Sequence, residues 1–453
     1  MLRSLIIVCL LFSALAAPLH AQEPATAAAA EALTDFPDNL PRNPQLLQVY
    51  SVQALQEGQH EEFVRILKFA RTLRPDDPQL MAQLVAGYAL LNDKPNAYSI
   101  MLRMQRQGLS FDFDQIEQTA SIRSTEVYKH INTLLKQLGQ PVGDATAAFT
   151  LPATATMPET IAWDAANQQL IIGTVRDGQL LQLSRDGQPQ TQAPALDNEG
   201  LWAIFGLAVD NERQRLWVSS TAVGQWNGYK ASDYGLSSLT AFDLKNGQPI
   251  STHRLVPDGE PHGLANLALG NDGSVYVADS RQPMVHVLRP GEEQLQTLFH
   301  NPSLTSIRGM AYDPQRQLLY LADREAGIGI WNDADQKLYR LINNDDQNVT
   351  GIDGLSLWNG QLIIVQNGIN PNRVMRLELT EDGLRIARHQ VLAAALESFA
   401  GPSYGTVAGD EFYLLGANHW GAYDINGQRL PGTRVDAVPV IRIALKEADA
   451  AEE

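Results

Sequence analysis

The apolar residues of this chain follow two different periods, one after the other. Between residues 43 and 140 they recur every three or four positions, which is the spacing of amphipathic helices. Four such stripes are formed by Leu47, Tyr50, Ala54 and Leu55; by Phe63, Leu67, Ala70 and Leu73; by Leu80, Leu84, Gly87, Tyr88 and Leu91; and by Ala97, Ile100, Met101 and Met104. Asn43 and Pro44 supply a cap and a first-turn proline. The pattern predicts a small α-helical domain at 43–140.

From residue 145 onward, short strand patterns separated by Gly, Asp and Asn turns replace the helical spacing. A unit made of an inner strand, a tight turn and a fully apolar second strand occurs six times. The inner segments are 161–164, 207–210, 267–270, 310–313, 355–358 and 405–407, and the second segments are 169–173, 215–218, 274–279, 318–323, 361–365 and 411–415. A continuous apolar strand is typical of a sheet buried on both faces.

The distance from one copy to the next is 43 to 60 residues, which fits four-stranded blades around an axis. We therefore predict a mainly β fold, a six-bladed β-propeller over 145–446 that follows the small α-helical domain. The last copy lacks a fourth strand, and residues 148–151 are the expected substitute. Pairing the first segment with the last would remove the exposed edge of the sheet.

The first 21 residues are typical of a cleaved signal peptide. Arg3 precedes the apolar run 5–12, and small residues lead to Ala21. The apolar run is too short to span a bilayer, and no later segment is long enough, so no membrane span is expected. We expect a periplasmic or secreted protein with a flexible spacer at 22–42 and an acidic tail at 447–453.

Composition narrows the chemistry. Cys9 is the only cysteine and lies in the expected signal peptide, which excludes a disulfide or a thiolate metal site in the mature chain. The formal charge of −17 makes nucleic acid an unsuitable partner, because an acidic surface repels phosphate.

In a propeller, the inner strands all begin at the same mouth of the central channel. The residues at these six starts should therefore form a circle: Glu159, Phe205, Ala265, Arg308, Asp353 and Tyr404. Two carboxylates, a guanidinium and two aromatic rings are suited to a small-molecule site.

Two long loops open on the same face. Residues 221–238 contain Trp226, and residues 417–438 contain Asn418, His419 and Trp420. Long loops with their own aromatic residues are often functional. These loops either bind a ligand or only plug the channel, and the sequence does not decide between the two.

Several segments resemble the senescence-marker-protein/gluconolactonase family of propellers. The segments 158–164 and 353–356 are similar to its first- and fifth-blade signatures, and 417–420 with 439–442 is similar to the closing segment of its periplasmic members. The segment 239–247 looks like the yellow/royal-jelly type of propeller instead. The helix pairs 45–74 and 79–107 resemble tetratricopeptide repeats, which implies a docking surface for a protein partner.

The gluconolactonase-like resemblance implies a calcium or other divalent ion at the channel mouth. Glu159 and Asp353 match two of the family's metal ligands, and Asp353 also matches its acid or base in lactone hydrolysis. The family's two asparagine ligands are replaced, because Ala265 stands at the third-blade position and Arg308 at the fourth.

Two interpretations remain. In one, Asn266 turns inward, with His262 nearby, and a metal site survives. In the other, the Arg308 guanidinium replaces the ion, pairs with Glu159 and Asp353, and anchors an anionic or carbonyl ligand.

Two functions remain as well. The first is hydrolysis of a lactone or ester with Asp353 as acid/base and Glu159 beside it. The second is a non-catalytic propeller that binds a small ligand or a protein. Expected ligand-binding residues in either case are Arg308, Asn266, His262, Phe205, Tyr404, Trp226, Asn418, His419 and Trp420.

Overall fold

The computed structural model describes residues 40–41, 43–190, 193–256 and 258–446. The expected signal peptide, nearly all of the spacer and the acidic tail lie outside these residues. The described residues form two compact units. One comprises residues up to Gly139 together with Asp345–Asn348, and the other comprises Gln140–Asn344 and the residues from Val349 onward. Each unit is described by itself.

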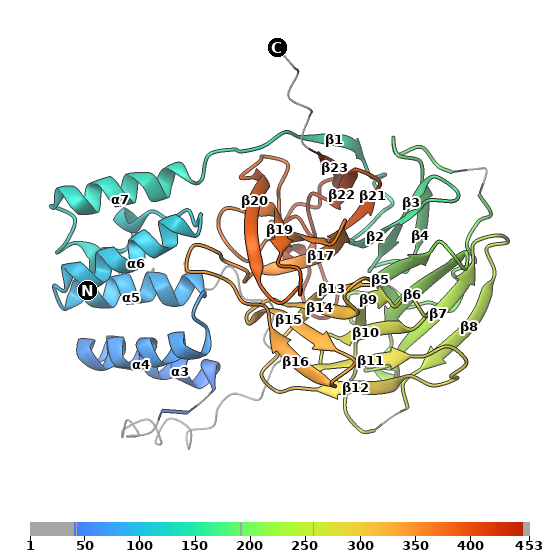
Figure 1. The fold of residues 1–453 in the computed structure, drawn as a ribbon, viewed down its shortest axis with the longest axis horizontal. Coiled ribbons are helices and arrows are strands. Elements are labelled where there is room, and N and C mark those ends of the chain that lie inside the picture. Colours follow the sequence, from blue (N-terminus) through green and yellow to red (C-terminus); the bar gives the residue numbers. More distant parts are fainter. Residues whose placement is uncertain (1–39, 42, 191–192, 257, 447–453) are drawn as a thin grey trace, which may run out of the picture. The chain divides into compact units, whose positions relative to one another are not determined.

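The first unit contains five α-helices among its described residues, with each helix packed against the next in chain order (Figure 1). They are α3 (Pro44–Gln56), α4 (His60–Leu73), α5 (Pro78–Leu90), α6 (Lys94–Arg106) and α7 (Glu126–Gln137). Side-chain caps explain where they begin. The Asn43 side chain accepts a hydrogen bond from the Leu46 amide, and the Asp77 side chain accepts bonds from the Gln79 and Leu80 amides.

The helical region is confirmed, and α7 adds a helix beyond the four predicted stripes. Thr125 caps α7, and its buried face is formed by Tyr128, Ile131, Asn132 and Leu135. Tyr128, Ile131 and Leu135 have the three- and four-residue spacing that indicates a helix. The polar residue Asn132 lies on the same buried face and interrupts this apolar pattern. Asn132 is retained because its carboxamide oxygen accepts a hydrogen bond from the Phe113 amide at 2.9 Å.

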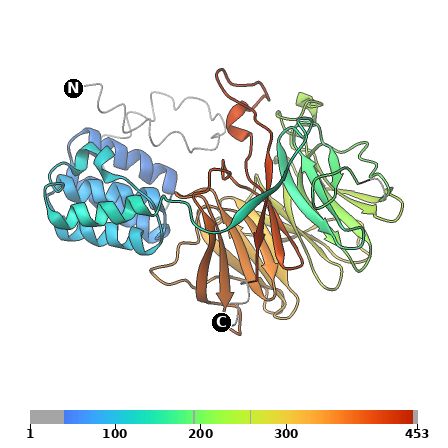
Figure 2. The ribbon, with the colours of Figure 1, turned by 90° about the horizontal axis from the view of Figure 1, so that it is seen from above.

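The second unit is a six-bladed β-propeller, as predicted. Its six sheets are antiparallel, and the inner strands contact one another in the closed order β2, β5, β9, β13, β17, β21 and back to β2. Figure 1 shows these strands around one centre, and Figure 2 shows the sheets from another side.

The first three blades are β2 (Pro158–Asp164), β3 (Gln169–Thr174) and β4 (Leu180–Leu183); β5 (Ala203–Asp210), β6 (Arg215–Thr221), β7 (Ser237–Asp243) and β8 (Pro249–Arg254); and β9 (Leu264–Leu269), β10 (Val275–Asp279), β11 (Met284–Leu288) and β12 (Gln296–His300). The next two are β13 (Ile307–Asp313), β14 (Leu318–Asp323), β15 (Gly327–Asn332) and β16 (Lys337–Arg340); and β17 (Ile352–Trp358), β18 (Gln361–Gln366), β19 (Arg373–Leu379) and β20 (Ile386–Ala394). The sixth blade is β21 (Gly405–Ala408), β22 (Glu411–Leu415) and β23 (Pro439–Ala444), completed by β1 (Ala145–Thr150).

Burial follows the radial position of each strand. The second strands β3, β10 and β14 are buried along their whole length, whereas the outer strands β8, β12 and β16 are largely exposed. The apolar core lies between neighbouring blades. For example, Tyr276 and Val287 of the third blade share a buried cluster with Met310 and Leu321 of the fourth.

The ring closes as the sequence indicates. Strand β1 pairs antiparallel with β23, with Ala145 opposite Ile443 and Thr150 opposite Pro439. The N-terminal strand of the unit thus supplies the fourth strand of the last blade, and it covers an edge that would otherwise be open.

Candidate functional site

The side chains at the channel mouth are aimed inward by β-bulges. Five inner strands shift register against their second strands at the predicted positions: Glu159, Phe205, the pair Ala265 and Asn266, Arg308 and Asp353. A bulge inserts one extra residue and redirects its side chain. The sequence pattern placed these residues before the inner strands. In the structure they lie within the strands, because strand pairing continues on both sides of each bulge. In the sixth blade Tyr404 does precede β21.

Glu159 is a buried carboxyl group at this mouth. Its side chain belongs to a residue only 4% exposed, and its Oε2 accepts a hydrogen bond from Trp420 Nε1 at 2.7 Å. Burial and the nearby Asp353 charge raise the pKa of Glu159 to about 8, although the Trp420 bond and Arg308 oppose this shift. This raised pKa favours the protonated form of Glu159 at pH 7.

Arg308 supplies the positive charge. Burial opposes that charge, but attraction to Asp353, Tyr404 and Glu159 outweighs it and raises the pKa of the guanidinium. Its Nε donates a hydrogen bond to Ser306 Oγ at 2.8 Å. Arg308 thus lies in the electrostatic field of both carboxyl groups, whereas the sequence suggested that it pairs with them directly.

Asp353 has a different ion-pair partner from the one expected. Its Oδ1 lies 3.0 Å from Arg324 Nη1, and its Oδ2 accepts a hydrogen bond from Asn367 Nδ2 at 2.6 Å. Arg324 Nη1 also donates to Asn367 Oδ1 at 2.8 Å. This triad fixes the carboxylate and compensates its charge.

Asn266 faces the channel, since its Nδ2 donates a hydrogen bond to Tyr404 Oη at 2.9 Å. Burial, first, and the charges of Asp353 and Glu159 raise the pKa of Tyr404, so its hydroxyl stays protonated. Asn266 therefore turns inward, but it binds a tyrosine hydroxyl.

These side chains make a poor site for the divalent ion that the resemblance implies. A Ca²⁺ ion needs six or more oxygen ligands. The mouth instead offers an Asn266 side chain bound to Tyr404, a carboxylate held by Arg324, the buried Glu159 carboxyl group and the Arg308 cation, which would repel an ion. The donor set does not fit, so we derive no chemistry through a bound ion here.

The two long loops meet over one side of the mouth. Phe205 and Trp420 stack at 6.0 Å between ring centroids, and both pack with Trp226 and Tyr423 on a small buried cluster. Figure 2 shows the segment that contains Trp420, in red, projecting beyond the ends of the strands. The loops are also tied by polar bonds, from Gln225 Nε2 to Asp424 O at 3.0 Å and from Arg176 Nη1 to Gly427 O at 2.9 Å.

The two long loops, with Trp226 and Trp420, form a cover over one side of the mouth. Asn418 and His419 stabilise the conformation of this cover. Asn418 donates to Gly401 O at 2.8 Å and accepts from the Trp420 amide, and His419 Nε2 is bonded to Asp436 O at 2.8 Å. Burial, the larger effect, lowers the pKa of His419. The hydrogen bonds of both side chains stay within or beside their own loop, so they position Trp420.

His262 is bonded away from this group. Its Nδ1 lies 2.6 Å from Asp279 Oδ2 and its Nε2 lies 3.1 Å from Asp258 Oδ1.

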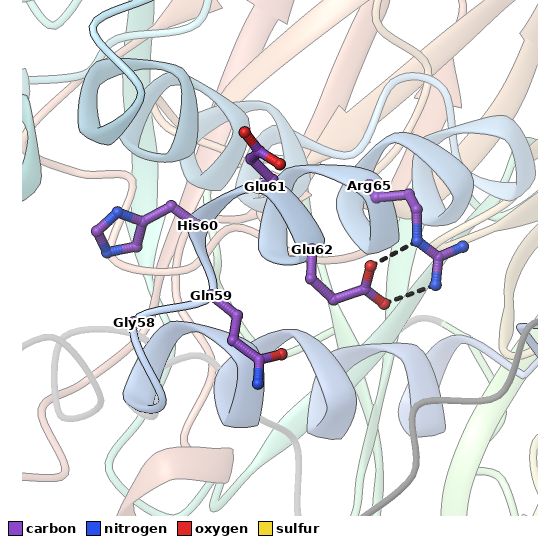
Figure 3. Close-up of a pocket in the computed structure, with 6 residues that line it drawn as sticks. All are labelled: Gly58, Gln59, His60, Glu61, Glu62 and Arg65. Carbon is purple, nitrogen blue, oxygen red and sulfur yellow. Dashed lines mark hydrogen bonds and ion pairs between the residues drawn. The ribbon is translucent and has the colours of Figure 1, made fainter.

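A depression of about 500 Å³ occurs elsewhere, on the helical unit (Figure 3). It is lined by Gly58, Gln59, His60, Glu61, Glu62 and Arg65. These residues come from one short stretch around the start of α4, and Glu62 is already paired with Arg65 at 2.6 Å. This hollow is the space beside the start of α4. We place the candidate site at the propeller mouth instead, because the charged side chains converge there.

Sequence reasoning missed Arg324 and Asn367, the two partners of Asp353. Both directly follow a second strand, since β14 ends at Asp323 and β18 ends at Gln366. The loops after second strands open at the same mouth as the starts of the inner strands. The first residues of these loops therefore form a second circle around the mouth. Their positions could have been read from the ends of the predicted second strands.

Comparison with known proteins supports the fold. No family model and no curated protein matches the chain. Among solved structures, the chain is similar to the major allergen Mala s 1 of Malassezia sympodialis, with 13% identity and a TM-score of 0.50 over 69% of this chain and 98% of that one.

Solved structures that are similar to the chain also include gluconolactonases. The Xanthomonas campestris gluconolactonase XC5397 has 19% identity and a TM-score of 0.43 over 68% of this chain and 92% of that one. A putative gluconolactonase has 15% identity and a TM-score of 0.43 over 66% of this chain and 91% of that one. At these identities the similarity concerns the fold, and a fold does not determine function.

In the described part of the chain, no helix has the length and apolar character needed to cross a membrane.

Proposed function

We propose that the propeller is an exported, metal-independent hydrolase of a small lactone or ester, with its site at the channel mouth. The observation that carries this proposal is the pairing of unlike carboxyl groups. Burial raises the pKa of Glu159 to about 8, whereas Asp353 forms an ion pair with Arg324. Two carboxyl groups in such different surroundings are the usual arrangement for acid and base roles.

In the proposed reaction, Asp353 accepts a proton from a water molecule as that water attacks the carbonyl carbon. The negative charge that develops on the carbonyl oxygen is stabilised by the Arg308 guanidinium. When the bond to the leaving oxygen breaks, Glu159 gives its proton to that oxygen. The products are a hydroxy acid, or an acid and an alcohol, and the proton on Asp353 returns to Glu159 through solvent.

The substrate charge follows from the same residues. Arg308 favours a carbonyl or carboxylate group, and the ring of Trp420 beside Phe205 offers an aromatic face. Tryptophan combines an apolar ring face with a polar N–H, which suits a ligand that has both apolar and polar groups. A sugar lactone therefore fits better than a cationic or a long aliphatic ester.

The test is turnover of a panel of sugar lactones and small aryl esters, with and without a chelator. We expect turnover that the chelator does not change and that Asp353→Asn lowers about 100-fold or more, the usual contribution of a general base. Glu159→Gln should lower kcat and remove the fall in activity at high pH. Glu378→Gln, at an exposed ion pair with Arg388 far along β19, is the matched control and should leave turnover unchanged.

A second candidate is a non-catalytic binding propeller. The observation that favours it is the cover, because Trp420 and Phe205 lie over a Glu159 that is only 4% exposed. If no member of the panel is hydrolysed while a lactone or sugar acid raises the melting temperature of the native chain but not of Arg308→Met, the hydrolase proposal is wrong and the binding function stands.

A further inference from the structure

The third blade contains a buried cluster of two imidazoles and one carboxylate. It is made of His262 before β9, Asp279 at the end of β10 and His286 in β11. One ligand atom from each residue can be chosen so that all three lie within 4.8 Å of one another. His262, Asp279 and His286 are 5%, 1% and 3% exposed.

The polar atoms of this cluster are unevenly satisfied. Asp279 Oδ1 accepts three backbone hydrogen bonds, from the amides of Gly263, Arg281 and Gln282. Asp279 Oδ2 is left to face both rings, at 2.6 Å from His262 Nδ1 and 3.6 Å from His286 Nε2. Within the described structure neither ring nitrogen of His286 has a hydrogen-bond partner. A buried imidazole without partners is costly unless something else binds it.

The fourth blade shows that a blade of this propeller forms without such a cluster. In the fourth blade, Asp323 occupies the position of Asp279, opposite the start of the inner strand. Its carboxylate is satisfied by backbone amides and by the Thr305 hydroxyl at 2.9 Å, where the third blade has His262. Gly329 stands where the third blade has His286. The fourth blade therefore has neither histidine at the equivalent positions.

We propose that His262 Nδ1, Asp279 Oδ2 and His286 Nε2 bind a divalent transition-metal ion, with Zn²⁺ as the expected ion. Two imidazoles and one carboxylate are a common zinc ligand set, and water completes the tetrahedron. Ligand atoms in such a site lie roughly 3.3 Å apart, given metal–ligand distances near 2.0–2.2 Å. The separations from Asp279 Oδ2, 2.6 and 3.6 Å, lie on either side of that value, and one ligand atom from each residue can be chosen so that all three lie within 4.8 Å, so the side chains must shift to bind the ion.

The surroundings support the same ligands. Asp258 Oδ1 lies 3.1 Å from His262 Nε2, on the ring nitrogen that would not bind the metal. A carboxylate in this place is the usual partner that orients a ligating histidine. The three backbone amides on Asp279 Oδ1 fix the carboxylate in the same way. The ion would tie the segment just before β9, the strand that carries Asn266, to the end of β10 and the middle of β11. This site does not depend on the proposed hydrolase.

The experiment is a titration of the metal-stripped full chain with Zn²⁺, measured by competition with a chromophoric chelator, and with Co²⁺, measured by its visible absorption. We expect one ion per chain and the intense absorption of tetrahedral Co²⁺. His286→Gln should weaken binding at least ten-fold. The matched control is His300→Gln, on the exposed strand β12 of the same blade, which should bind as the native chain does.

Equal binding by the native chain and His286→Gln, or no binding by the native chain at micromolar Zn²⁺, would overturn the proposal. If His286→Gln fails to fold, crystals of the native chain soaked in Zn²⁺ decide the matter. An anomalous peak between the three residues supports the site, and its absence with the crystals intact excludes it. In that case His262 and Asp279 form only an ion pair.

Discussion

At the scale of single residues, the channel mouth depends on how burial separates two carboxyl groups. Among the residues that the structure describes, Glu159 loses water and gains one hydrogen bond, from Trp420, whereas Asp353 gains a guanidinium and an amide. The cost of burying an uncompensated charge exceeds what a single hydrogen bond returns, so Glu159 holds its proton.

The first prediction concerns the pH dependence of stability. The pKa of Glu159 is about 8 in the folded chain against an ordinary 4.5, so the folded state holds one more proton than the unfolded state between these values. The free energy of unfolding should therefore fall as pH rises from about 5 to 8, by up to about 1.4 kcal/mol per pH unit from this group. Urea unfolding of the native chain and Glu159→Gln across this range measures it, and the variant should lack that part of the fall.

Glu378→Gln is the control, because Glu378 is paired with Arg388, and Arg388 lowers the pKa of that carboxyl. Its contribution is present above the ordinary pKa and lost only in acid. The control should keep the fall between pH 5 and 8. An identical slope in Glu159→Gln and the native chain would contradict the assigned protonation.

A second prediction separates the two roles of Trp420. Its N–H donates to the carboxylate form of Glu159 and lowers the pKa of that group. Trp420→Phe keeps the aromatic ring but removes the donor, so the pH midpoint of the stability change should move upward. Trp226→Phe, in the same cluster, should leave the midpoint unchanged. A midpoint that stays in place for both variants would show that the hydrogen bond does not form in solution.

At the scale of strands and loops, the sequence repeat predicted the six blades but did not predict the β-bulges. The alternation of apolar residues placed Glu159, Arg308 and Asp353 at equivalent positions, and the structure brings them to one mouth. The pattern does not encode the extra residue in each inner strand, because a bulge depends on how a strand packs on the next blade. The pattern also did not reveal that Arg324 pairs with Asp353, or that His286 lies beside Asp279 and His262. These contacts join residues from different strands and loops.

The close packing of inner strands gives a third prediction. A Cβ at Gly206, at the bulge of β5, would lie 2.2 Å from Ala265 O and 2.7 Å from Ser219 Oγ. Gly206→Ala should therefore force β5 away from β9 and cost about 2 kcal/mol or more of unfolding free energy. Gly421→Ala is the control, because its new methyl group would meet no described atom within 4 Å and its backbone is not left-handed. Equal melting temperatures for the two variants would be inconsistent with this contact.

At the scale of the whole molecule, the propeller is stabilised by closure as well as by its blades. Each blade buries apolar residues against its two neighbours, so a ring has no end blade with an uncovered face. Among the sheets that the structure describes, only the sixth blade is completed by a strand from the other end of the unit, and its four strands follow the order β1, β23, β22, β21.

The last prediction tests that closure with two shortened chains. A chain that begins at Gln140 lacks the five helices of the first unit but keeps β1, and we expect it to fold and to melt in one cooperative transition. A chain that begins at Pro152 also lacks β1, so β23 loses its ladder from Ala145 to Thr150 and exposes an unpaired edge. Backbone hydrogen bonds contribute about 1 kcal/mol each, so a loss of several kcal/mol is expected, together with aggregation at the open edge. Calorimetry and light scattering measure both effects, and because the two chains differ only in residues 140–151, equal melting behaviour would mean that β1 does not close the ring.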